Sequence, residues 1–292
     1  MASESISLRP IAGARHRPAW QRELKHDWLI HVFIVFGLLV ASIPIALMLL
    51  ISVKNMGQFI TKPLGITFPL DWSNYTIAWN VLKRSILNSL GMTTVTVILS
   101  LLVSSLAAYA FSRFRFPGRE ALFWFYLSVL FIPGILTFAT QFTLVARMGI
   151  LDTYIVQILP YIAHAQIFQT VVLRAFFAGI PNEIIESAMV DGANFWRVFI
   201  KIVLPMSRPI LATLAVMRAL SFWDEWLWPL ITITKWELRP MGLQVFYLSS
   251  DIGAHVGRQM AGYTIATIPM LILFIIASKQ FVEGLTSGAM KF

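Results

Sequence analysis

Residues 186–205 read ESAMVDGANFWRVFIKIVLP and lie between two apolar runs that are long enough to cross a bilayer. The residues before them, Pro181-Asn182-Glu183, can start a helix with Asn182 as its N-cap and an acid in the first turn, where the helix dipole favours negative charge. Gly192 stands at a natural stop position. About nine residues make only about 13 Å of helix, so this segment cannot span a membrane.

The short helix is amphipathic, and its polar face is acidic. Four apolar residues share one face, at the i, i+1, i+4, i+5 spacing: Ile184, Ile185, Ala188 and Met189. Helices that lie on lipid headgroups usually carry Lys and Arg, because the cytoplasmic leaflet is anionic. This one carries Glu183, Glu186 and Asp191. We therefore expect a groove on a partner protein to bury the apolar stripe, and an interfacial helix is the alternative.

Composition places the chain in a membrane. Of its 292 residues 58% are hydrophobic and only 13% charged, with a mean hydropathy of +0.74, whereas soluble domains are about a quarter charged. The net charge of +9 does not indicate nucleic-acid binding, because the basic residues are dispersed at the ends of apolar runs, where they fix topology. Cysteine is absent, which excludes disulfides and thiolate sites. No cluster of His and acids predicts a metal site.

Six segments have the length of about 20 apolar residues that a membrane-spanning helix needs: 28–53, 86–112, 120–146, 154–174, 208–232 and 261–281. We predict an all-α membrane protein with six transmembrane helices and a cytoplasmic helix between the fourth and fifth. If the N-terminus is in the cytoplasm, the cytoplasmic segments carry more Lys and Arg than the external ones. Both termini are therefore expected in the cytoplasm. The predicted organisation is a cytoplasmic tail (1–27), a six-helix transmembrane domain (28–283, with a loop at about 181–205) and a cytoplasmic C-terminal tail (284–292).

The loop resembles the EAA loop of importer permeases of the ATP-binding cassette (ABC) class, whose pattern is E-A-A, three residues, G, nine residues, I-x-L-P. The matching residues here are Glu186-Ser187-Ala188, Gly192, Ile202, Leu204 and Pro205, with Ser187 in place of the first alanine. The resemblance implies that the helix docks in a cleft of a cytoplasmic ATPase. Glu186 would make the polar contact, Ala188 would allow close approach, and Gly192 would make the turn.

Further motifs resemble the maltose-type permease subunit of the type I carbohydrate importers: Asn88-Ser89, the run 106–111 ending in Arg113, the stretch 222–229 and the tail. The resemblance implies that tail residues contact the ATPase, namely Gly284, Leu285, Thr286, Ser287 and Gly288. It also implies a multi-pass protein of a bacterial or archaeal cytoplasmic (inner) membrane. Its partners would be a second permease subunit, a dimer of ATPase subunits, an extracellular or periplasmic solute-binding protein and a sugar. The chain has no phosphate-binding Gly-x-x-x-x-Gly-Lys-Ser/Thr sequence, so ATP and Mg would be bound by the ATPase and no cofactor by this chain.

An aromatic and acidic stretch in the fifth predicted span supplies candidates for the substrate path: Trp223, Asp224, Glu225, Trp226 and Trp228. Ionisable groups inside a membrane must face protein or water, and Arg218 shares a helix face with Glu225, so the two can pair. Indole rings beside carboxylates suit a sugar, although aromatic residues also form belts or gates at membrane interfaces. The intramembrane amides Gln141 and Asn88 either line the path or hold helices together.

Two other classes of function are weaker. An ion-coupled secondary transporter predicts inverted repeats and matched broken helices, and no internal repeat is evident. An intramembrane enzyme needs a nucleophile with a base, or acids on adjacent spans, whereas Asp224 and Glu225 lie in one segment. The sequence therefore predicts a transport subunit without catalytic residues of its own.

Overall fold

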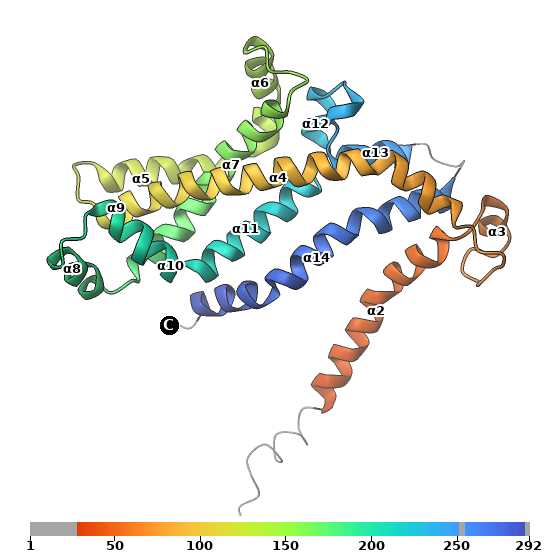
Figure 1. Cartoon of the computed structure of the whole chain (residues 1–292), viewed down its shortest axis with the longest axis horizontal. Coiled ribbons are helices and arrows are strands. Elements are labelled where there is room, and N and C mark those ends of the chain that lie inside the picture. The colour runs from red at the N-terminus through yellow and green to blue at the C-terminus, as the bar shows by residue number, and fades with distance from the viewer. Residues whose placement is uncertain (1–27, 251–254, 290–292) are drawn as a thin grey trace, which may run out of the picture. The chain divides into compact units, whose positions relative to one another are not determined.

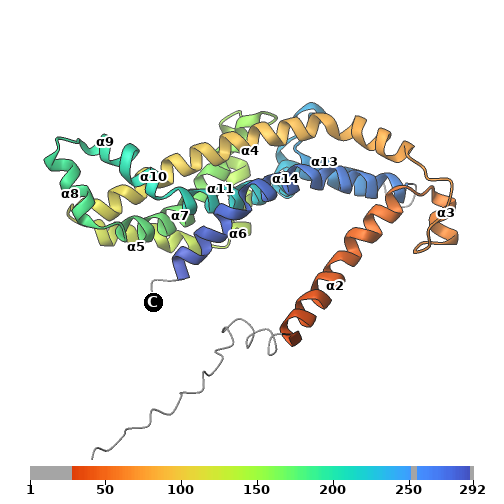
Figure 2. The ribbon, with the colours of Figure 1, turned by 60° about the horizontal axis from the view of Figure 1, so that its bottom comes forward.

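The computed structural model describes residues 28–250 and 255–289, shown from two directions in Figures 1 and 2. Its regular structure is helical, and these two ranges contain no strand, so the prediction of an all-α protein is confirmed. The long helices are α2 (Trp28–Ser52), α4 (Ser73–Arg113), α7 (Tyr154–Ala178), α11 (Arg208–Trp223) and α14 (Val256–Ala289). The tail predicted at 1–27 and the last residues, 290–292, lie outside the described residues.

The chain divides into two units, Met1–Leu47 and Met48–Phe292. The described part of the first unit is one apolar helix, most of α2. None of the side chains in its most apolar stretch is buried, as expected of a helix solvated by lipid or by another subunit. The boundaries of α2 agree with the predicted span at 28–53 to within one residue.

In the second unit α4 packs most extensively against α7, and α11 and α14 also pack on α4. The 41 residues of α4 rise about 62 Å, which is twice the thickness of a hydrocarbon core. The predicted span at 86–112 is therefore only part of α4. The helix begins at Ser73 because Asn74, Ala78, Leu82 and Ser85 are buried at helical spacing and extend its packed face.

Two of the predicted spans are not continuous helices. The third, 120–146, consists of α5 (Arg119–Ser128), a short 3₁₀ turn (Val129–Phe131) and α6 (Gly134–Arg147), with an angle of 97° across the break. Pro133 causes the break, because proline donates no N–H and holds the preceding Ile132 in an extended conformation. The fifth, 208–232, is split at Asp224–Trp226 into α11 and α12 (Leu227–Thr232).

Within the described residues, four helices are long and apolar enough to cross a membrane, or up to six if each of two bent pairs is one span. The second bent pair joins Phe195–Met206 to α11 at an angle of 74°. The remaining helices are short: α3 (Met56–Thr61), α8 (Asn182–Val190), α9 (Phe195–Val198), α10 (Leu204–Met206) and α13 (Met241–Ser250).

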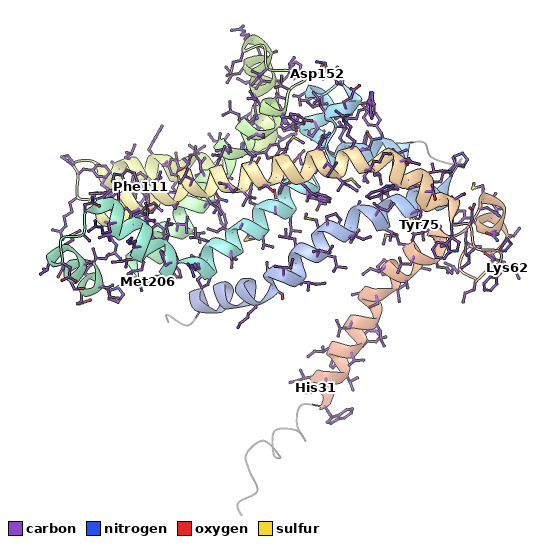
Figure 3. All side chains as sticks on the ribbon, viewed as in Figure 1. His31, Lys62, Tyr75, Phe111, Asp152 and Met206 are labelled. Carbon is purple, nitrogen blue, oxygen red and sulfur yellow. The ribbon has the colours of Figure 1, made fainter. Side chains whose placement is uncertain are left out.

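The short helices α8, α9 and α10 gather beside the C-terminal end of α4 in both views (Figures 1 and 2). Figure 3 shows Phe111 and Met206 at this end, and Tyr75 and Lys62 at the other. A cluster of buried side chains, called the loop core below, lies under the short helices: Ala108, Tyr109, Leu173, Phe177, Ile180, Ile185, Val198, Phe199, Val203 and Leu214. The loop core joins α4 and α7 to the segment that the sequence singles out.

At the opposite end of α4, the turn that precedes it is organised by a buried lysine. Lys54 is 1% exposed, and its ammonium donates hydrogen bonds to the backbone carbonyls of Lys62, Pro63 and Gly65, at 2.8, 2.8 and 2.6 Å. The amide of Asn74 donates to the carbonyls of Ser52 and Lys54. These bonds fix the turn that leads into α4.

Candidate functional site

The helix α8 has the nine residues that the sequence predicts, but its cap differs. Pro181 occupies the N-cap position, so the prediction of Asn182 as the N-cap is wrong by one residue. The side-chain oxygen of Asn182 instead accepts a hydrogen bond from the guanidinium of Arg113, at 2.6 Å. Glu183 lies in the first turn, as predicted.

Gly192 ends α8 in the left-handed conformation, with a φ of 80°. Its N–H donates to the carbonyl of Met189 (3.0 Å), and the N–H of Ala193 donates to that of Ala188 (2.9 Å). This pair of bonds is a Schellman motif, in which glycine is favoured because it has no Cβ. A Cβ added at Gly192 would meet no atom within 4 Å, so glycine is required for its backbone conformation and not for lack of space.

The apolar stripe of α8 is divided between the chain and its surroundings. Ile185 is 7% exposed and belongs to the loop core, and Ala188 packs against the same core. Ile184, Met189 and Val190 are 38%, 53% and 87% exposed. The chain itself therefore covers half of the predicted stripe, and docking of the exposed half in a partner's groove stays a prediction. The exposed apolar residues, with Glu183 and Glu186, form what is called the outer face of α8 below.

Arg113, the last residue of α4, ties three helices together. It donates hydrogen bonds to the carbonyls of Phe177 and Ile180 (2.7 Å for the second), at the C-terminal end of α7, and to Asn182 of α8. Carbonyls at a helix C-terminus lack partners inside the helix and carry the negative end of the dipole, so a guanidinium suits them. The beginning of α8 is therefore held in a fixed position relative to α4 and α7.

The segment after Gly192 leads towards α11 through a π-helical turn, Phe199–Val203. Pro205 accounts for this turn, because its ring would clash with the carbonyl four residues earlier in a regular helix. The N–H of Leu204 donates to the carbonyl of Phe199, five residues back. Ile202 and Leu204 pack against the loop core, so these residues of the Ile-x-Leu-Pro pattern hold the segment between Gly192 and α11 in place.

Two of the predicted path residues are core residues. Trp223 and Trp228 are 3% and 2% exposed, and their indole N–H groups donate to the carbonyls of Ala266 (3.2 Å) and Val156 (2.9 Å). Each of them also lines a cavity, so their role on the substrate path stays a prediction. Trp226 is 41% exposed and stacks on Phe246 at 4.7 Å between ring centroids.

Glu225 and Arg218 have partners other than each other. One carboxylate oxygen of Glu225 accepts from the N–H groups of Leu227 (3.0 Å) and Trp228 (3.1 Å), at the start of α12. Arg218 donates to the carbonyl of Tyr161 at 2.6 Å and lies over its ring. The two charges interact electrostatically, but the direct pair that their spacing allows is not formed.

Asn88 holds helices together. Its amide donates to the carbonyls of Glu237 (2.7 Å) and Arg239 (3.1 Å) and accepts from the hydroxyl of Tyr154 (3.0 Å). Of the two uses weighed for this amide, helix packing is therefore the one that the structure shows. Gln141, in contrast, lines a cavity.

Asp152 forms a link that the sequence does not indicate. Its carboxylate accepts from the N–H groups of Thr234 (2.6 Å) and Lys235 (3.0 Å) and from the Thr234 hydroxyl (2.6 Å), which joins the α6–α7 loop to the segment after α12. The Thr234 hydroxyl, followed by the Lys235 backbone, lowers the pKa of the Asp152 carboxyl.

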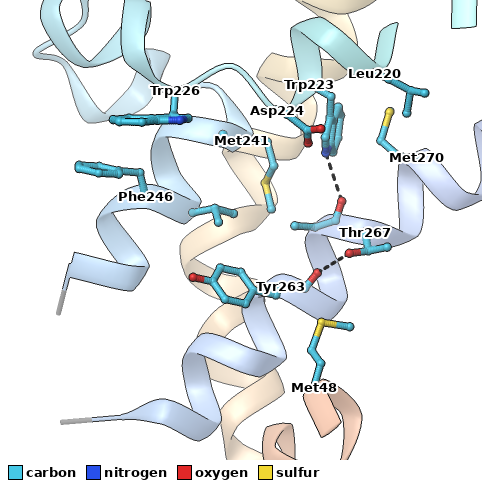
Figure 4. A pocket seen from close by; sticks show the side chains of 13 residues that line it. Met48, Leu220, Trp223, Asp224, Trp226, Met241, Phe246, Tyr263, Thr267 and Met270 are labelled. Carbon is cyan, nitrogen blue, oxygen red and sulfur yellow. Dashed lines mark hydrogen bonds between the residues drawn. The ribbon is translucent and has the colours of Figure 1, made fainter. Parts of the chain in front are cut away.

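Several cavities open between the helices. One of them, of about 630 Å³, is lined by Trp223, Asp224, Trp226, Phe246 and Tyr263 among others (Figure 4). Two smaller ones, of about 240 and 260 Å³, lie between α7 and α11 and share His164, Arg218 and Ser221. Asp224 and Trp226 therefore line one cavity, whereas Gln141 and Glu225 line another.

The backbone of the predicted tail, Gly284–Gly288, continues α14 to Ala289, and its side chains lie outside the described ones. The described residues contain no group of three or more His, Cys, Asp or Glu side chains that could hold a metal ion. The geometry is therefore that of a helical membrane domain with a short helix presented beside one end of it.

Comparison with known proteins agrees with this geometry. Residues 100–287 match the family described as "Binding-protein-dependent transport system inner membrane component". The chain is 32% identical to a probable ABC transporter permease protein, YurM, of Bacillus subtilis (strain 168), over 89% of this chain and 87% of that one. It is 27% identical to the diacetylchitobiose uptake system permease protein NgcG of Streptomyces coelicolor, over 89% and 88%.

The fold is that of solved importers. A bacterial ABC transporter involved in the import of the acidic polysaccharide alginate gives a TM-score of 0.74 at 20% identity, over 94% of this chain and 100% of that one. The family match covers most of the chain, and the relatives cover nearly all of it. The chain therefore belongs to the binding-protein-dependent transport system inner membrane components, the permease family of the ABC importers.

Proposed function

We propose that this chain is one of two membrane subunits of an ATP-driven sugar importer, and that two cytoplasmic ATPase subunits bind the ATP and Mg. Relatives are named for uptake of diacetylchitobiose, arabinooligosaccharides and trehalose, and these names support a saccharide substrate here. Permeases of this family work with a solute-binding protein, and a solved relative is a complex with one.

The observation that carries the proposal is the outer face of α8. It combines exposed apolar side chains with two exposed carboxylates, on a helix too short to span a membrane. Such a surface fits a groove on a soluble protein that supplies basic or N–H donors. We assign that protein as the ATPase, with Glu186 as the polar contact and the tail Gly284–Gly288 as a second contact.

The mechanism follows from two states of the complex. Closure of the ATPase dimer moves α8, and the loop core and Arg113 carry this movement to α4 and α7. The two permease subunits then alternate between inward-open and outward-open forms. Docking of the loaded binding protein favours the outward-open form by its higher affinity for that form.

This proposal requires α8 and both termini to lie in the cytoplasm. Because the chain contains no cysteine, Val190→Cys would supply its only thiol, at a position that is 87% exposed. A membrane-impermeant thiol reagent should label Val190→Cys in inside-out vesicles of the chain alone and fail to label it in right-side-out vesicles. Labelling in right-side-out vesicles would reverse the orientation.

Reconstitution tests the function itself. The chain is assembled in lipid vesicles with the permease, ATPase and binding protein encoded beside it, and ATP hydrolysis and uptake are measured with a panel of neutral and acidic oligosaccharides. Hydrolysis that needs this chain and rises with one sugar-loaded binding protein is expected. Uptake driven by a sodium or proton gradient without ATP would refute the proposal.

A further inference from the structure

The two smaller cavities lie between α7 and α11, and both polar and apolar side chains line them. They share His164, Arg218 and Ser221 and are together called the groove below. Its lining residues recur at intervals of three and four on both helices, from Pro160 to Gln169 on α7 and from Leu214 to Ser221 on α11. The stretch of α7 rises about 14 Å, roughly half of a hydrocarbon core of about 30 Å.

Lipid is not a suitable solvent for this groove. Arg218, Glu225, His164 and Gln141 all line it, and ionisable groups inside a membrane face water or protein because their exposure to hydrocarbon is costly. The apolar cavity between α4, α11 and α14 provides a contrast, because its lining contains no charged residue. The groove is therefore the polar face that these helices turn towards an aqueous path or another subunit.

The charges of the groove compensate each other. The groove is lined by one cationic and one anionic side chain, Arg218 and Glu225, and the Arg218 guanidinium donates to the Tyr161 carbonyl. A carboxylated ligand would need a cation without such compensation. Two neutral side chains, the Gln141 amide and the Ser221 hydroxyl, line the same cavity, and aromatic rings of Phe138 and Tyr161 lie beside them. Amide, hydroxyl and aromatic groups together suit an uncharged sugar ring with many hydroxyls.

We infer that this groove, and not the cavity lined by Trp223, Asp224 and Trp226, is where the chain contacts its substrate during transport, and that the ligand there is an uncharged glycosyl unit. The inference rests on the proposed function and adds to it the site and the charge class of the substrate. It retains part of the expectation from sequence, because Gln141, Glu225 and Trp228 line the groove, whereas Trp223, Asp224 and Trp226 line the other cavity.

Cysteine protection tests the site. The test variant is Ser221→Cys, and the control variant is Gln166→Cys, which lies on the same helix as His164 but outside the groove lining. Each variant has a single thiol in the chain. Both variants are assembled into the complete transporter in vesicles, and the rate of modification by a positively charged, water-soluble methanethiosulfonate is measured with and without the transported sugar. If the folding of Ser221→Cys fails, Gln141→Cys replaces it.

The sugar should slow modification of Ser221→Cys by about tenfold at ten times its dissociation constant, because occupied sites do not react. Gln166→Cys should be unaffected. In addition, Gln141→Ala should raise the KM for the sugar by about tenfold through loss of one hydrogen bond, and Gln166→Ala should leave it unchanged.

The outcomes separate the two proposals. If the wild-type complex hydrolyses ATP in response to no sugar, the proposed function fails. If the wild-type complex is active but Ser221→Cys is unreactive or unprotected, the groove is covered by a partner subunit or faces lipid, and the inference is overturned. Transport of an oligogalacturonate in preference to every neutral sugar would overturn the assignment of charge class.

Discussion

Substitution of Gly192 separates backbone conformation from docking at the outer face of α8. The residue has a φ of 80°, and a Cβ at this position would have no neighbour within 4 Å, so alanine adds strain without a clash. A non-glycine residue in this conformation costs about 1–2 kcal/mol. Since about 1.4 kcal/mol is a factor of ten, Gly192→Ala should raise the population in which the end of α8 is unravelled by about tenfold.

Two further substitutions complete the comparison. Gly192→Asn should keep near-normal behaviour, because asparagine tolerates the left-handed region. Gly192→Trp has the strain of alanine and also adds bulk beside the exposed Met189 and Val190. Any loss in the tryptophan variant beyond the loss in the alanine variant therefore reports on steric exclusion of a partner.

The assay is sugar uptake per ATP hydrolysed in the reconstituted complex, with membrane insertion and thermal stability of the chain as controls. The expected order of uptake per ATP is wild type and Gly192→Asn together, then Gly192→Ala, then Gly192→Trp with almost no uptake. Equal uptake by the alanine and tryptophan variants would refute docking at this surface. Equal uptake by the alanine and asparagine variants would refute the conformational argument.

Three other predictions follow from single contacts. Arg113→Ala should destabilise the loop core by about 1–3 kcal/mol, because it leaves carbonyls at the end of α7 without a hydrogen-bond donor. Arg113→Lys should restore only part of this stability, and thermal unfolding of the purified chain measures both variants. Gly257→Ala should lower expression and stability, because its Cβ would lie 2.2 Å from the Lys54 carbonyl oxygen. The control Gly91→Ala should lower neither, because a Cβ there would meet no atom within 4 Å. The pKa of the Asp152 carboxyl is lowered in the folded state, so its stabilising link to Thr234 should be complete above the ordinary value of 3.8 and lost as the pH falls through the lower folded value. Asp152→Asn should therefore weaken the protection of the Thr234 and Lys235 amides from hydrogen exchange at neutral pH. Unchanged protection of these amides would contradict this prediction.

The sequence predicts those elements whose signals are local. The apolar length of α2, the nine residues of α8 and the turn at Gly192 all depend on residues within a few positions of each other, and all appear in the structure. The break at Pro133 also has a local signal, Ile132-Pro133-Gly134, although the apolar length of 120–146 predicts one span there.

The other differences come from contacts between residues far apart in the sequence. Arg113 reaches carbonyls more than 60 positions away, and Trp228 donates to Val156, 72 positions away. Hydrophobic pattern alone cannot show that an indole faces the core, since a membrane helix is apolar on every side. For the same reason, the division of the α8 stripe between Ile185 and Met189 becomes visible only when the loop core is assembled.

The burial of Ile185 in the loop core, with Ala188 packed against that core, has a mechanical consequence. A helix that touched its own chain only through flexible ends would act as a tether and would lose most of an applied displacement in its linkers. Here the same helix is wedged into close-packed side chains of α4 and α7, and such interiors are stiff and transmit strain. A push of an ångström on its exposed side should therefore reach the tips of both long helices as a movement of similar size.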